Sequence, residues 1–87
     1  MFKINKEKIF WRTVENEIVI LNIDTGMYYM LDGPGKAIWD MVAAGKGEDE
    51  IAGKIVSIFD VDTKTAAKDL EDLIKAFKKE GLIEKGK

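Results

Sequence analysis

Three segments in the first part of the chain have the hydrophobic pattern of β-strands. Residues 9–14 divide into two faces with a period of two, and residues 18–23 and 27–31 are rich in β-branched, aromatic and other apolar side chains. The polar run 15–17 and the turn 24–26 separate these segments by connections short enough for hairpins. The pattern therefore predicts a three-stranded antiparallel meander.

The rest of the chain has the apolar periodicity of helices. Pro34 suits the first turn of a helix over residues 34–44, and Asp62 suits the N-cap of a helix over residues 63–80. Between them, residues 48–59 open with three acids that favour the helix dipole. The apolar stripe expected for this middle helix is Ile51, Ile55, Ile58 and Phe59. Strands followed by helices predict an α+β fold, a meander followed by a three-helix bundle.

Length and composition restrict the classes of protein to which the chain can belong. Its 87 residues suffice for one hydrophobic core, so residues 1–87 are expected to form a single domain. The net charge of -2, without a separate basic block, is a poor footprint for nucleic acid or an anionic membrane. No apolar run approaches the roughly 18 residues of a membrane span. The absence of cysteine fits a reducing cytoplasm, where we expect the protein.

The chain lacks the side chains on which most enzymes depend. It contains no His and no Cys, so Ser57, the only serine, has no histidine to activate it. Gly33–Lys36 has part of a phosphate loop without the required spacing, and Asp60 and Asp62 begin a calcium-loop pattern that lacks its glycine. Helix initiation and capping explain these residues better. We expect no catalytic residue, no metal site and no cofactor.

The helix over residues 63–80 has polar rows on both sides of its apolar face. The row on one side consists of Thr65, Asp69, Asp72 and Ala76. This row could line a groove with a small floor at Ala76, or it could be a plain boundary between core and solvent. Asp69 and Asp72 are also neighbours on the helix, but the lysines close to them favour a solvated surface over acid–base chemistry.

The strand over residues 27–31 is apolar on both faces, whereas a half-buried strand should alternate. If Tyr29 faces the helices, then Tyr28 and Met30 face away from them. As the last strand of the meander it should also be a sheet edge, and it lacks the lysine, proline or inward charge that usually protects edges. The residues alone leave three interpretations open: capture of an extended peptide as an added strand, pairing in a homodimer, or burial of both faces within the protein.

The segment over residues 21–39, LNIDTGMYYMLDGPGKAIW, resembles the pattern vLld-x-x-tG-x-yy-x-Ln-x-x-G-x-x-iW of PqqD-like proteins. These are the precursor-peptide recognition elements of ribosomal peptide modification. The resemblance continues through Ile51-Ala52, Asp69–Ile74 and Gly81–Ile83, so that it spans about residues 9 to 83. Asp32 departs from the pattern, which usually has asparagine there.

This resemblance implies a winged-helix-like fold and a non-catalytic, peptide-binding module. The leader segment of a precursor peptide would dock as an extra strand on the third strand, against the third helix. The peptide-binding residues would be Met27, Tyr28, Tyr29, Met30, Leu31 and Asp69, with Thr65, Asp72 and Ala76 added by helical spacing only. The implied partners are the leader peptide and a separate modifying enzyme, often a radical S-adenosylmethionine (radical SAM) enzyme. The chain itself would be a monomer or weak homodimer.

A winged-helix DNA-binding regulator is the alternative, because the two architectures overlap. Such a regulator needs a basic recognition helix and an affinity that depends on salt. Lys54 is the only cation between residues 48 and 59, which speaks against this function.

Overall fold

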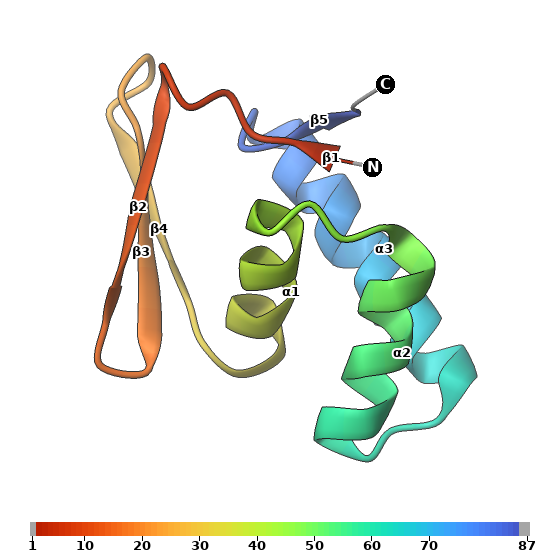
Figure 1. The fold of residues 1–87 in the computed structure, drawn as a ribbon. Coiled ribbons are helices and arrows are strands. Elements are labelled where there is room, and N and C mark those ends of the chain that lie inside the picture. Colours follow the sequence, from red (N-terminus) through yellow and green to blue (C-terminus); the bar gives the residue numbers. More distant parts are fainter. Residues whose placement is uncertain (1, 86–87) are drawn as a thin grey trace.

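The computed structural model describes residues 2–85, in which three strands pack against three helices (Figure 1). The elements of this main unit are β2 (Ile9–Val14), β3 (Glu17–Asn22), β4 (Met27–Leu31), α1 (Gly33–Ala43), α2 (Glu48–Phe59) and α3 (Thr63–Lys79). The strands pair antiparallel in the order β2-β3-β4. The predicted α+β fold, a meander followed by three helices, is confirmed.

Two short strands that the sequence pattern did not indicate join the ends of the described chain. β1 (Phe2–Lys3) pairs antiparallel with β5 (Glu84–Lys85), as Figure 1 shows. This pairing brings Phe2 and Leu82 into the core, where each is less than a tenth exposed. A two-residue strand is too short to show a period of two, so no sequence signal marks it.

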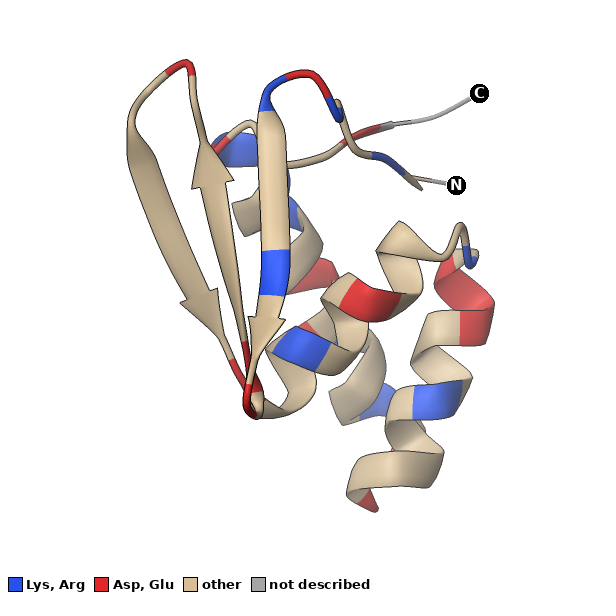
Figure 2. Cartoon of the chain, turned by 60° about the vertical axis from the view of Figure 1, so that its left-hand side comes forward, with Lys and Arg blue, Asp and Glu red and all other residues tan. Residues whose placement is uncertain are grey.

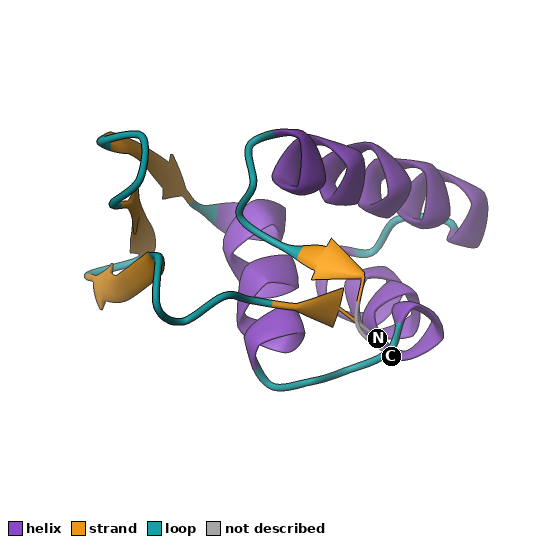
Figure 3. Cartoon of the chain, turned by 90° about the horizontal axis from the view of Figure 1, so that it is seen from above, coloured by secondary structure: helices purple, strands orange, loops and turns teal. Residues whose placement is uncertain are grey.

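The three-stranded sheet has one covered face and one open face. Viewed from above, all three helices lie on the same side of it (Figure 3). We call the side chains toward the helices the inner face, made of Ile9, Trp11, Ile18, Ile20, Asn22, Tyr29 and Leu31. The opposite set is the outer face, made of Phe10, Arg12, Val14, Glu17, Val19, Leu21, Tyr28 and Met30. The alternation of the pleat fixes the two sets.

An aromatic cluster joins the sheet to two of the helices. Trp39 of α1 is fully buried, and its ring lies edge-on to Trp11 of β2 and to Phe77 of α3, with centroids 5.4 Å and 5.3 Å apart. Its indole Nε1 has no hydrogen-bond partner among the described residues. Trp39 is therefore held by packing alone, at the point where sheet, α1 and α3 meet.

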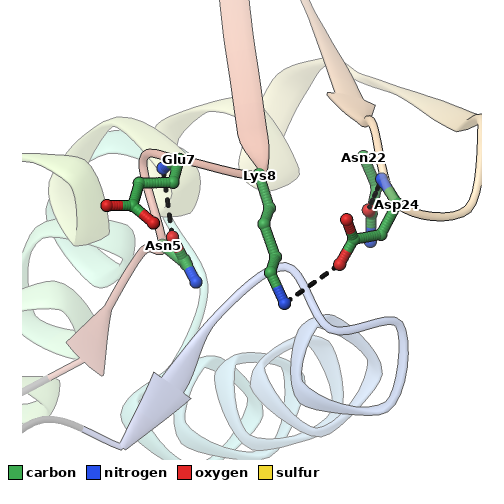
Figure 4. A network of polar contacts seen from close by, with 5 residues as sticks. All are labelled: Asn5, Glu7, Lys8, Asn22 and Asp24. Carbon is green, nitrogen blue, oxygen red and sulfur yellow. Dashed lines mark hydrogen bonds and ion pairs between the residues drawn. The ribbon is translucent and has the colours of Figure 1, made fainter.

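Polar contacts set the ends of β2 and β3 (Figure 4). The buried Asn22 accepts the Asp24 N–H through Oδ1 at 3.0 Å, which starts the turn into β4. Lys8 Nζ lies 3.0 Å from Asp24 Oδ2, and Asn5 Oδ1 accepts the Glu7 N–H at 3.0 Å. These local bonds hold the entry of β2 beside the turn that leads into β4.

Both ends of α3 are capped, the first by Asp62 as the sequence predicts. Asp62 Oδ1 accepts the Thr65 N–H at 2.7 Å, and this bond holds the pKa of Asp62 below its usual value of 3.8. At the other end Gly81 adopts φ +73°, and the Leu82 N–H bonds back to the Phe77 carbonyl at 2.9 Å. The capped helix is placed so that its C-terminal end lies near β4.

Candidate functional site

The open edge of β4 is the first element of the candidate site. In the part of the chain that the structure describes, β4 pairs with β3 alone. Its other side carries backbone groups that no strand satisfies. β2 is the opposite edge of the sheet, but β4 is the edge joined by side-chain contacts to α3, as described below.

The hydrogen-bond pattern shows which backbone groups of β4 point outward. The Ile23 N–H donates to the Lys8 carbonyl at 3.0 Å, which makes the neighbouring pair Ile9–Asn22 a non-bonded pair of the β2–β3 ladder. Asn22 and every second residue before it therefore direct their backbone groups to β4 instead. Through the observed register, Tyr28 and Met30 are left with N–H and C=O groups that point away from the sheet.

The side chains of Tyr29 and Leu31 close the space between β4 and α3. The Tyr29 hydroxyl donates to Glu80 Oε2 at 2.9 Å, and this hydrogen bond raises the pKa of Tyr29 above 10. A Cβ built on Gly35 would lie 3.5 Å from Leu31 Cδ2 and 4.0 Å from Leu73 Cδ2, so both leucines border this glycine, one from β4 and one from α3. We call the surface that Tyr29, Leu31, Leu73 and Glu80 form between the two elements the β4–α3 groove.

The predicted row on α3 borders this groove over part of its length. Ala76 and Asp69 lie one helical turn from Leu73, on the flank that also carries Glu80. Asp72, on the solvent side of that flank, forms an exposed ion pair with Lys68 at 3.5 Å. All four residues of the row are exposed.

Thr65 is the member of the row that the structure does not bring to β4. It lies eight residues before Leu73, about 12 Å further along the helix axis, and Leu73 is already level with the last residue of β4. Its N–H and hydroxyl are both bonded to Asp62. The structure therefore gives Thr65 a role in capping the helix.

Two contacts of the groove were absent from the sequence prediction. The helical spacing of Leu73 predicts a core position, but Leu73 is only partly buried and lies beside Gly35, which Leu31 also borders. Glu80 was treated as the end of the helix. Its position four residues after Ala76 places it on the same flank, and this spacing was the available signal.

The groove presents backbone groups, apolar side chains and carboxylates. Within residues 2–85, no three His, Cys, Asp or Glu side chains gather closely enough to hold a metal ion. A hollow of about 600 Å³ lies elsewhere, between the N-terminal segment and the end of α1. None of the described helices has both the length and the apolar character that a membrane span requires. What the groove offers is an unpaired backbone edge, an apolar floor and an acidic rim.

Comparison with known proteins places this geometry in a family. The chain matches the family described as "Coenzyme PQQ synthesis protein D (PqqD)" over residues 17–83. No curated protein matches the chain. A solved structure described as "TbiB1 in Complex with the TbiA(beta) Leader Peptide" is 32% identical, with a TM-score of 0.90 over 98% of both chains. A second, "Lasso peptide synthetase B1 complexed with the leader peptide", has 20% identity and a TM-score of 0.87 over 97% of this chain and 98% of the other.

The second solved structure shares the fold, and the first also shares about a third of the sequence along its whole length. The family match covers most of the chain, including β3, β4 and all three helices. The resemblance found in the sequence is thereby confirmed, and the chain belongs to the PqqD family.

Proposed function

We propose that this protein is a non-catalytic module that captures the leader segment of a precursor peptide and presents it to a modifying enzyme. The observation that carries the proposal is the unpaired edge of β4, where Tyr28 and Met30 offer outward N–H and C=O groups beside the apolar floor of the groove. The complex of TbiB1 with its leader peptide supports it, because that protein resembles this chain over nearly its full length.

The geometry divides recognition between backbone and side chains. An added strand would bond to Tyr28 and Met30, and these bonds carry no sequence information. Alternate side chains of the peptide would then enter the groove, above Leu31, Leu73 and Ala76, where apolar groups of suitable size gain contact. Specificity would come from this second set.

The module would act by raising the local concentration of the core peptide at the enzyme. A leader held on β4 keeps the attached core peptide near a bound enzyme, which raises its effective concentration at that active site. The resemblance implies that this partner is a radical SAM enzyme. The enzyme class stays a prediction, because the two similar solved structures are complexes with leader peptides.

The DNA-binding alternative is not favoured by any feature of the structure. Helix α2 opens with Glu48, Asp49 and Glu50, and Lys54 is its single cation. An anionic duplex would meet this helix with repulsion at its N-terminal end.

Amide exchange and chemical shifts of the isotope-labelled chain test the proposal. The probe is the TbiA(beta) leader peptide, which binds a protein that is 32% identical to this chain. We expect the amides of Tyr28 and Met30 to become protected and those of Leu73 and Ala76 to shift. The amides of Trp11 and Thr13, which point outward from the opposite edge β2, are the internal control and should not change. Protection at β2 instead, or no change at saturating peptide, would refute strand addition to β4.

A further inference from the structure

The outer face of the sheet is apolar and uncovered. Of the seven exposed large hydrophobic side chains in the described chain, four belong to it: Phe10, Val14, Tyr28 and Met30, which are 51%, 43%, 71% and 65% exposed. Figure 2 shows these strands almost free of charged residues apart from one basic position in β2. A shallow hollow of about 240 Å³ is lined by Phe10, Trp11, Arg12, Val19 and Leu21. Soluble proteins seldom leave such a face without a partner.

The basic position is Arg12, in the middle of this face. It stands opposite Val19 in the β2–β3 ladder, and Val19 stands opposite Met30 in the β3–β4 ladder. Among the described residues, no ion pair and no side-chain hydrogen bond includes Arg12. Phe10, Val14, Val19 and Leu21 lie around Arg12 on this face, and Glu17 is the acid diagonal to it at the hairpin end. A guanidinium among mainly apolar side chains is a frequent anchor of protein interfaces, where it meets a carboxylate.

We propose that the outer face docks the modifying enzyme, through an apolar surface of that enzyme that carries a carboxylate for Arg12, and that the bound leader completes the docking surface. This inference rests on the proposed function, since it takes the leader to be an added strand on β4. The side chains of that strand which do not enter the groove would stand on the same side as Tyr28 and Met30. They would widen the outer face by one strand.

The area of the face supports a completed surface. Its exposed apolar side chains amount to roughly 450 Å², taking the usual areas of aromatic and aliphatic residues. A stable interface needs about 800 Å² on each partner. The empty module therefore offers about half of what is needed, and the strand of a bound leader supplies part of the remainder. The enzyme would then bind the loaded module more tightly than the empty one.

Charge argues against a second copy of this chain as the occupant. Two outer faces packed about a two-fold axis near their centre would bring one Arg12 close to the other, with apolar side chains around both. The acid on the face of each copy is Glu17, which lies at its end in the hairpin with Val14. A partner with its own carboxylate removes this conflict.

Fluorescence anisotropy of the labelled leader tests the inference. The leader is titrated with the chain alone and with the chain plus the modifying enzyme that acts on the same precursor peptide. Because coupling between two ligands is reciprocal, the enzyme should tighten leader binding by about tenfold. Arg12→Glu and Phe10→Ser change residues of β2, away from the groove. Without the enzyme, both variants should bind the leader with an affinity within about twofold of the wild type. With the enzyme, neither variant should show the tenfold increase in leader affinity. Lys54→Glu on α2 makes the same charge change at another exposed site and should keep it.

Each result decides between explanations. Full tightening in both outer-face variants would overturn the inference while leaving leader capture intact. A wild-type dimer in sedimentation at micromolar concentration that Arg12→Glu separates would overturn it in favour of a second copy. If the leader does not bind the wild-type chain at all, the proposed function fails. Sedimentation of the enzyme mixed with the chain, without leader, then tests whether the outer face docks the enzyme. Weak binding of the enzyme that Arg12→Glu abolishes would support docking at this face, and no binding would refute it.

Discussion

The two faces of the β2–β3–β4 sheet are similar in composition and opposite in environment. On the inner face Ile18 and Ile20 are fully buried, whereas on the outer face Tyr28 and Met30 are exposed by more than three fifths. Both sets are apolar, yet only one is covered by helices (Figure 3). The comparison teaches that an apolar strand residue can indicate a contact within the chain or a contact with another molecule. Those of the inner face make contacts within the chain, and we propose that those of the outer face make contacts with other molecules.

The largest difference between the faces should appear in stability. Ile20→Ala leaves a cavity at the centre of the inner face, so we expect the free energy of unfolding to fall by about 2–5 kcal/mol. Met30→Ala on the outer face removes a mostly solvated side chain and should change it by less than about 0.5 kcal/mol. Urea denaturation of both variants measures this. A Met30→Ala loss as large as that of Ile20→Ala would mean that the outer face is buried in solution.

The sequence could predict the two sets of side chains but could not show which set is covered. A period of two separates Tyr29 from Tyr28 and Met30, and that separation is what the structure shows. Cover depends on where other elements pack. The N-terminal segment, a possible cover for the outer face, instead forms β1 and pairs with β5. That pairing joins residues more than eighty positions apart, so no local pattern indicates it.

Helix periodicity was a good guide to α3 and a weaker one to α2. Ala66, Leu70, Ile74 and Phe77 of α3 are all buried, as their spacing predicts. In α2 the predicted stripe holds at Ile51 and Ile55, but Ile58 is 58% exposed, so that part of the prediction is wrong. Figure 1 shows that the last turn of α2, which contains this position, extends past α1.

The direction of backbone groups along β4 was not predictable, because it depends on the hydrogen-bonded register. Because the structure shows the register, two proline substitutions in β4 can be predicted to have different effects. Met30→Pro removes an outward N–H and should leave the sheet folded, but weaken leader binding by about tenfold or more, since an edge strand tolerates proline only on its free side. Tyr29→Pro removes an N–H directed to β3 and should disrupt the β3–β4 ladder itself.

Circular dichroism and anisotropy, applied to both proline variants, measure fold and leader binding separately. Tyr28→Pro is the matched second site, because its N–H also points outward. A Met30→Pro variant that folds and binds the leader like the wild type would show that the edge is not used.

The inner face also carries a polar residue, Asn22, and its burial should increase the effect of its hydrogen bond on stability. Asn22→Ala removes the acceptor of the Asp24 N–H within a largely buried site, so we expect a loss of about 1 kcal/mol in the free energy of unfolding. Thr25→Ala in the same turn removes a comparable bond, from the Met27 N–H to Thr25 Oγ1, at an exposed site. Thermal unfolding should show the smaller loss for Thr25→Ala. Equal losses would contradict a role for burial.

The smallest effect concerns the bond between the sheet and α3, and it depends on pH. The pKa of Tyr29 is raised in the folded protein by its hydrogen bond to Glu80, so the stabilising effect of that bond is fully present below the usual pKa of 10.0. It is lost as the pH rises through the raised pKa of the folded state, because the ionised phenolate cannot donate to a carboxylate. Tyr29→Phe should therefore be slightly less stable than the wild type at neutral pH, and the difference should vanish in strong alkali. Tyr28→Phe on the outer face is the control, because it removes a hydroxyl without a hydrogen-bond partner among the described residues. Melting temperatures from neutral to alkaline pH should show a difference from the wild type that shrinks with pH for Tyr29→Phe and no such change for Tyr28→Phe. If Tyr29→Phe matches the wild type at every pH, the hydroxyl does not hold β4 against α3, and the packing of Leu31 and Leu73 beside Gly35 would have to hold the groove.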